Sequence, residues 1–134
     1  NGRVHVSINL LDWAKKVESL GAGEINITSV NYEGLQKGYD IKNINKISKN
    51  INIPILAHGG CGDPKDVLEL AQNTNVSGAV IASFFHYNSI SRFKKFVSKV
   101  GNTDFLDNLS GIKKNFNLIK KIKSTLKLKG FNVR

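Results

Sequence analysis

The sequence has little of several features that would direct it to a special environment. Its 134 residues contain one cysteine, two prolines and no methionine. No run approaches the roughly 18 apolar residues of a membrane span. A single cysteine excludes an internal disulfide, and no spaced set of metal ligands accompanies it. We therefore expect a cytoplasmic protein with no membrane association, no metal ion and no cofactor.

Acidic residues are scarce as well. Ten Asp and Glu residues stand against twenty Lys and Arg residues, which gives a formal net charge of +10. Many of the lysines lie in the last quarter of the chain, among apolar residues spaced three and four apart between Ile112 and Leu126. This spacing predicts an amphipathic outer helix with a solvated basic face. No aromatic platform is interleaved with the lysines, so we expect no nucleic-acid partner.

Helices and strands are predicted to alternate along residues 10–83. Helical patterns cover residues 10–20, 40–51 and 63–72, the last with Asp63 as N-cap and Pro64 in the first turn. Short, nearly continuous apolar runs at 24–30, 53–57 and 78–83 are typical of buried parallel strands. This order predicts an α/β fold with a parallel sheet.

Three strands cannot close a barrel, and an open three-stranded parallel sheet leaves long edges exposed. The chain also begins Asn-Gly-Arg, without an initiator methionine or a signal peptide. We therefore expect residues 1–134 to form a single partial domain, a fragment whose remainder is missing. A smaller open sheet is the alternative interpretation.

Three places in the chain join the end of a predicted strand to the start of a helix. They are Glu33 with Gly34, the cluster from Gly59 to Gly62, and Ala82 with Ser83. In parallel α/β folds such junctions form the functional edge. Glycines let the backbone approach an anion and helix N-termini donate N–H groups, so a phosphate is the expected ligand. The alternative is that the glycines only shape the turns.

Two side chains near these junctions have both a chemical and a structural interpretation. His58 ends the second strand, where it can carry a proton, donate to an anion, or simply pack. Cys61 lies between glycines with no nucleophile motif around it. We interpret Cys61 as a small turn residue.

Several segments, taken together in order and spacing, resemble one family. They are the stretch from Leu11 to Ile25, Thr28-Ser29-Val30, Gly38-Tyr39-Asp40, Pro54-Ile55 with Ala57, Gly59-Gly60, Ala82-Ser83 with Phe85-His86, and the closing Gly130 to Arg134. They resemble the last three strands of the cyclase subunit of imidazole glycerol phosphate synthase. The resemblance covers residues 1 to about 93 and the final helix, and residues 94–115 look like an insertion between them.

The resemblance implies that the chain is the C-terminal part of a (β/α)8 TIM barrel, with the remainder of the barrel as a partner. It also implies an enzyme of histidine biosynthesis, a lyase that receives ammonia from a glutaminase subunit. That enzyme forms imidazole glycerol phosphate from a doubly phosphorylated ribonucleotide. The two catalytic aspartates of the family lie on its first and fifth strands. We therefore expect no catalytic residue in this chain and no activity from it alone.

The resemblance also implies the residues of one substrate phosphate site. The expected phosphate contacts are Glu33, Gly34, Gly60, Ala82 and Ser83, and the expected pocket-lining residues are Thr28, His58 and Gly59.

The sequence departs from the family where side chains would neighbour the substrate. The family typically has Asp-Arg-Asp-Gly-Thr where this chain has Asn31 to Leu35, and serine in the place of His58. The glycines that would hold phosphate are kept. The departures leave two other functions open: the barrel subunit of a sugar amidation system in surface polysaccharide synthesis, and a non-catalytic phosphate-binding module.

Overall fold

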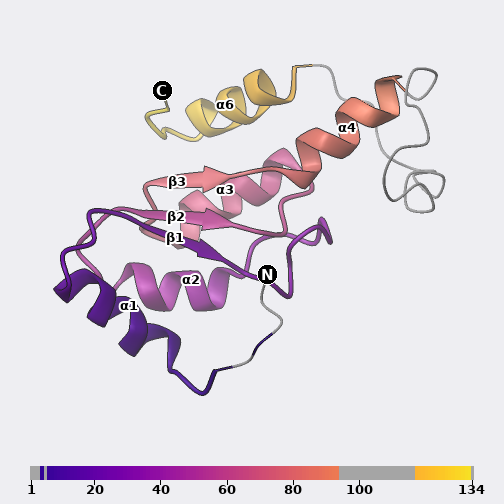
Figure 1. Ribbon diagram of the computed structural model, residues 1–134. Helices are drawn as coiled ribbons and strands as arrows, with labels where there is room; N and C mark the ends of the chain where they lie inside the picture. Colours follow the sequence, from indigo (N-terminus) through magenta and orange to yellow (C-terminus); the bar gives the residue numbers. More distant parts are fainter. Residues whose placement is uncertain (1–3, 5, 94–116, 134) are drawn as a thin grey trace.

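A computed structural model describes residue 4 and residues 6–93 and 117–133, and it has the expected alternation of helices and strands (Figure 1). In chain order the elements are α1 (Leu10–Ser19), β1 (Ile25–Thr28), α2 (Ile41–Ser48), β2 (Ile55–His58), α3 (Pro64–Asn73), β3 (Gly78–Val80), α4 (Ser83–Phe93) and α6 (Leu118–Leu128). The insertion expected at 94–115 lies outside the described residues.

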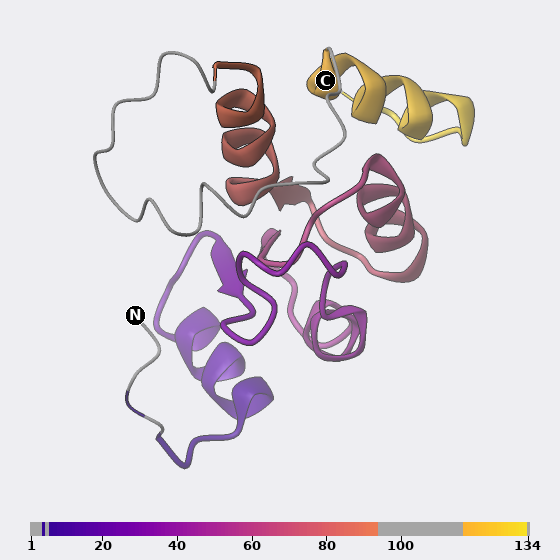
Figure 2. The ribbon, with the colours of Figure 1, turned by 90° about the vertical axis from the view of Figure 1, so that its right-hand side faces the viewer.

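The three strands form one parallel sheet in the order β1-β2-β3, as the sequence predicts. The register pairs Thr28 of β1 with His58 of β2, and His58 with Val80 of β3. The carboxyl ends of all three strands therefore reach the same edge of the sheet. Figure 2 looks onto this edge, where the loops that leave the strands lie beside one another.

Short polar side chains fix where the helices begin. Asn9 accepts from the backbone N–H groups of Leu11, at 2.9 Å, and Asp12, at 3.4 Å, so α1 starts at the predicted N-cap. Asp40 accepts from the N–H of Asn43 and caps α2. Each cap satisfies donors that the first helical turn leaves without an intrahelical partner.

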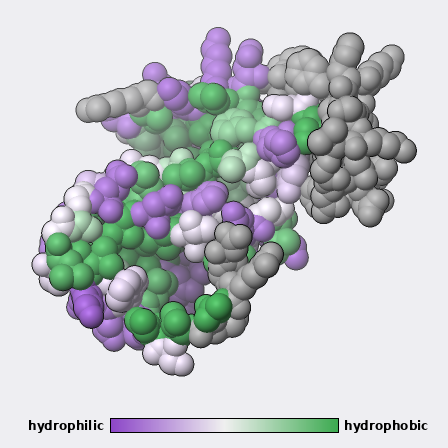
Figure 3. Space-filling view, in the orientation of Figure 1, coloured by the Kyte–Doolittle hydropathy of each residue, from purple (hydrophilic) through white to green (hydrophobic). Residues whose placement is uncertain are grey.

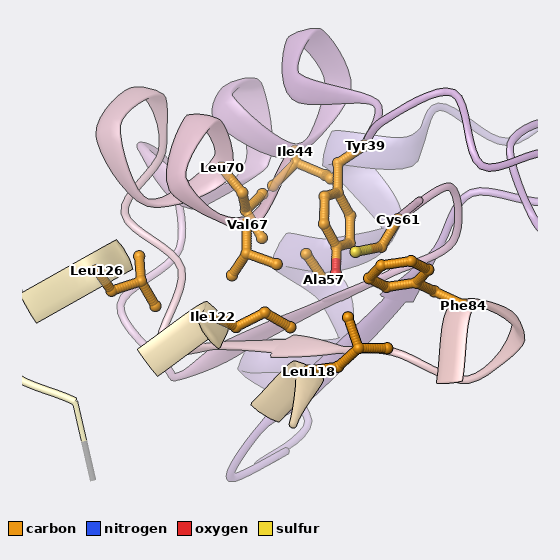
Figure 4. Packing of buried hydrophobic residues seen from close by; sticks show 10 residues of the cluster. All are labelled: Tyr39, Ile44, Ala57, Cys61, Val67, Leu70, Phe84, Leu118, Ile122 and Leu126. Carbon is orange, nitrogen blue, oxygen red and sulfur yellow. The ribbon is translucent and has the colours of Figure 1, made fainter. Parts of the chain in front are cut away.

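The core lies between the sheet and the helices that cover it. Figure 4 shows its larger cluster, which joins α2, β2, α3, α4 and α6. The largest fully buried side chains are Ile44, Ile47, Ile55 and Leu70. Burying each of them stabilises the fold by about 1.5–3 kcal/mol. The apolar face predicted for the last helix is confirmed over α6, where every fourth residue packs into this cluster: Leu118, Ile122 and Leu126.

One prediction about the strands needs correction. The third strand ends at Val80 and not at Ser83, because the chain turns at Ser83 into α4. The apolar face of α1 is buried only at Ala14, whereas Leu10 and Trp13 are about half exposed. Figure 3 shows apolar side chains gathered over α1 and the residues before it. Exposed apolar side chains gathered in this way are typical of a surface that packs against another segment or partner.

None of the helices in the described part of the chain combines the length and the apolar character needed to cross a membrane.

Candidate functional site

The strand ends enclose a small pocket of about 170 Å³. Every residue predicted for the phosphate site lines it except Thr28, and the full lining is Glu33, Gly34, His58, Gly59, Gly60, Cys61, Val80, Ile81, Ala82, Ser83 and Tyr87. Thr28 lies one step away, where its hydroxyl contacts His58. The parallel register thus brings together residues from three separate junctions.

The first junction is a tight turn after β1. The Ser29 carbonyl accepts hydrogen bonds from the N–H groups of Tyr32 and Glu33, both at 3.0 Å. Glu33 lines the pocket, but its main-chain N–H is already engaged by this turn. Gly34 follows with φ of 78°, a left-handed conformation that favours glycine, and its N–H is not used by the turn.

The second junction packs so closely against the first that its glycines are required by geometry. A Cβ built on Gly59 would lie 2.8 Å from the Ser29 carbonyl oxygen, and one on Gly60 would overlap the carbonyl of Gly38. Gly38 in turn donates its N–H to the Gly60 carbonyl at 2.9 Å. The structural interpretation of the glycine cluster is therefore correct for these positions.

The helix after the second junction caps its own N-terminus. The Asp66 carboxylate accepts from the N–H groups of Gly62, at 2.8 Å, and Asp63, at 2.9 Å. Asp63 accepts from the N–H of Lys65 at 2.9 Å and completes a capping box, with Pro64 at the first helical position as predicted. These carboxylates occupy the donors at the start of α3, so this helix end does not attract a second anion.

The third junction is built differently. Helix α4 has no acidic residue in its first turn, and its first helical bond runs from the N–H of His86 to the carbonyl of Ala82. Within the described part of the chain, the N–H groups of Gly34, Gly60 and Ser83 donate to no backbone carbonyl. Three residues whose backbone N–H groups have no backbone acceptor therefore line one pocket, and the N-terminal end of α4 lies beside it.

His58 and Cys61 complete the pocket wall between the junctions. The Nδ1 atom of His58 lies 3.2 Å from the Thr28 hydroxyl oxygen. Burial raises the pKa of the Cys61 thiol to about 12, and the thiol is only 3 % exposed. A neutral, buried thiol is a poor nucleophile, which agrees with its interpretation as a small turn residue.

Sequence reasoning missed Tyr87, whose side chain also lines the pocket. Tyr87 follows Ser83 by four residues on α4, and residues four apart share one face of a helix. The spacing would have identified it, had the extent of α4 been predicted.

Two larger hollows lie elsewhere, and both border α6. One, of about 600 Å³, is lined mainly by apolar side chains of α3, β3 and α6. The other, of about 740 Å³, lies between α4 and α6. Neither is bordered by the strand junctions that collect main-chain donors. The described residues also contain no group of three His, Cys, Asp or Glu side chains placed to hold a metal ion.

The chain is similar to known proteins over most of its length. The histidine biosynthesis protein family matches residues 1–91. The imidazole glycerol phosphate synthase subunit HisF of Lactococcus lactis subsp. lactis strain IL1403 is 48 % identical over 86 residues, which cover 64 % of this chain and 33 % of the relative. The subunit of the same name from Clostridium botulinum strain Kyoto is 42 % identical over 102 residues, 75 % of this chain and 40 % of the relative.

A third relative extends further. The HisF subunit of Clostridium botulinum strain Okra is 35 % identical over 133 residues, which cover 99 % of this chain and 42 % of the relative. The chain thus spans between 33 % and 42 % of the length of these relatives.

The fold and the similarities agree on what the described elements are. The parallel strands β1 to β3 with their helices form part of a (β/α)8 barrel, as the sequence predicts. The family match ends at residue 91, close to the limit expected from the resemblance. The chain belongs to the histidine biosynthesis protein family.

Proposed function

We propose that this chain supplies one phosphate-binding side of an ammonia-dependent cyclase that makes imidazole glycerol phosphate from a doubly phosphorylated ribonucleotide. Its partners in this role are the remainder of the barrel and a glutaminase subunit that delivers ammonia, in the cytoplasm. The relatives named imidazole glycerol phosphate synthase subunit support this reaction. Because the chain spans less than half of their length, the reaction belongs to the assembled barrel.

One observation carries the proposal: Gly34, Gly60 and Ser83 line a single pocket, and their N–H groups have no backbone acceptor among the described residues. Phosphoryl oxygens are strong acceptors, and the N-terminus of α4 adds partial positive charge. The pocket is also small enough to suit one phosphoryl group rather than a whole nucleotide.

The pocket holds one carboxylate, Glu33, beside His58, and the Cys61 thiol is held neutral by burial, which raises its pKa. The chain spans less than half of its relatives' length, and the resemblance assigns both catalytic aspartates of the family to strands outside it. We therefore expect this chain alone to bind phosphate without turning over substrate, and the catalytic aspartates to come from the rest of the barrel.

Nuclear magnetic resonance tests the binding site directly. Titrating inorganic phosphate into the 15N-labelled chain should shift the amide signals of Gly34, Gly60 and Ser83 in one saturable transition. Ala82→Asp should weaken binding about tenfold or more, because the exposed residue 82 would place a like charge beside the anion. Ser124→Asp, which adds the same charge on the exposed face of α6, is the matched control and should bind normally.

The outcomes separate cleanly. Saturable shifts at other amides, with these three unmoved, would place the site elsewhere. A folded chain that shows no saturable shift at all would refute phosphate binding.

The reaction itself is tested by grafting. We would replace the matched segment of the Lactococcus lactis relative with this chain and ask whether the hybrid supports growth of a histidine auxotroph. We expect the hybrid to support growth and the same hybrid with Ala82→Asp not to support it. A hybrid that folds and binds phosphate but fails to support growth would instead favour the second candidate, a phosphate-binding module with a different ligand. The presence of His58 in the pocket, where the family typically has serine, is the observation that favours this candidate.

A further inference from the structure

His58 occupies the centre of the pocket edge. It is the last residue of β2, the middle strand, and its Cα pairs with Thr28 on one side and Val80 on the other. Side chains alternate along a strand, and Ile55 and Ala57 are buried on the helix-covered face. His58 therefore projects from the opposite face together with Thr28, and it lines the pocket.

The hydroxyl of Thr28 engages one specific nitrogen of the ring. Thr28 Oγ1 lies 3.2 Å from His58 Nδ1, which is within hydrogen-bond distance. When the hydroxyl donates to Nδ1, the ring proton resides on Nε2; when the ring is doubly protonated, Nε2 again carries a proton. In both states Nε2 is the nitrogen left to donate to a ligand in the pocket, whereas in the tautomer with its proton on Nδ1 the ring donates to Thr28 and Nε2 can only accept.

The charges around the ring make this donor significant. The titratable groups that line the pocket from the neighbouring elements are Glu33 after β1, Cys61 after β2 and Tyr87 on α4. None of them supplies a positive charge, and among the described lining residues His58 is the one that does so when protonated. The many lysines of the chain contribute no lining residue here.

We propose that His58 is a phosphate-binding residue, oriented by Thr28 at Nδ1 and donating from Nε2 to the bound phosphoryl group. The inference rests on the proposed function, since it requires an anion in this pocket. It adds a feature that the main-chain donors lack. The pocket binds an anion more tightly when His58 gains a proton. The affinity for an anion of fixed charge therefore rises as the pH falls.

Sulfate is the probe that isolates this effect, because it keeps its double negative charge across the range in which histidine titrates, about pH 5 to 8. Inorganic phosphate changes its own charge within this pH range, which would mask the contribution of the protein. Sulfate affinity of the wild-type chain should rise about tenfold from pH 8 to pH 5, the size expected for a hydrogen bond to a charged group. His58→Gln, which keeps a polar group but gains no proton, should show a flat profile.

Thr28→Val tests the positioning role. It removes the hydroxyl with little change of shape, so the tautomer ratio of the His58 ring, read from its imidazole 15N shifts, should move away from Nε2–H. The rise of sulfate affinity at low pH should persist in this variant, with an overall loss of a few-fold.

Wild-type imidazole shifts keep the inference testable even where a variant fails to fold. Adding inorganic phosphate should move the Nε2 resonance of His58 and leave that of His86 in place. One outcome refutes the role of His58 and leaves the phosphate site standing. In it, phosphate shifts the amides of Gly34, Gly60 and Ser83 but leaves the His58 ring signals unchanged. His58→Gln then also shows the same pH profile of sulfate affinity as the wild type. If neither anion moves those amides, both proposals fail.

Discussion

Helices α3 and α4 begin at the same edge of the sheet, and they differ in the acidic residues at their N-termini. At the start of α3, Asp63 and Asp66 satisfy the main-chain donors from within the chain. At the start of α4 no acidic residue is present in the first turn, and the helix opens onto the pocket. The richer glycine cluster precedes the self-capped helix α3, whereas the candidate anion site faces the start of α4.

The difference shows that glycine content and anion binding are separate properties of a junction. Gly59 and Gly60 are fixed by the close approach of the loop after β1, whatever ligand is present. Binding capacity depends instead on which N–H groups remain unengaged, and those lie at all three junctions. A glycine-rich turn is thus a scaffold that brings donors near, and in the proposed site the start of α4 supplies the electrostatic attraction.

The largest effect should follow from Gly60→Val. The new side chain would overlap the Gly38 carbonyl and hold a β-branched residue at φ of 101°. We expect a loss of about 3 kcal/mol or more of unfolding free energy, measured by urea denaturation. A loss of phosphate binding in this variant would therefore not identify Gly60 as a binding residue, because the fold itself is destabilised.

Gly23→Val is the matched control for that variant, since nothing lies within 4 Å of a Cβ built there. It should unfold close to the wild-type midpoint. Equal stability of the two variants would mean that the loops after β1 and β2 are not packed as described.

Asp66→Ala should have an intermediate effect confined to the self-capped junction. Removing the carboxylate leaves the N–H groups of Gly62 and Asp63 without their acceptor, at a cost of about 1–2 kcal/mol of unfolding free energy. Phosphate affinity should change little, because neither Gly62 nor Asp63 lines the pocket. Glu69→Ala, on the exposed face of the same helix, is the control and should be near neutral. A tenfold change in phosphate affinity would show that the two helix starts act as one site.

Much of this arrangement is predictable from local sequence. Asp63 followed by Pro64 specifies a helix start, and short apolar runs separated by helices specify parallel strands whose ends meet at one edge. That alone brings Gly34, Gly60 and Ser83 together. The amphipathic spacing likewise predicts which face of α6 is buried.

What escaped prediction depends on contacts between distant segments. Thr28 and His58 are thirty positions apart, and only the register of β1 on β2 places their side chains together. The engagement of the Glu33 N–H by Ser29 depends on the shape of one turn, and the length of α4 decides that Tyr87 reaches the pocket. Patterns of residue type indicate which elements form, while donors and acceptors are assigned by their three-dimensional packing.

The smallest effect is a gain of stability, and it arises from making the open helix start resemble the self-capped one. Ala82→Asp places an exposed carboxylate where Asp63 stands before α3, so it should accept from the first N–H groups of α4 and oppose the helix dipole. We expect a rise of about 0.5–1 kcal/mol in unfolding free energy by urea denaturation, together with the loss of phosphate binding. Ala82→Asn should give a similar cap with a weaker loss of binding, because it lacks the charge. A variant that loses phosphate without any gain in stability would mean that the first turn of α4 is already capped, and the donors that define the site would then belong to another segment.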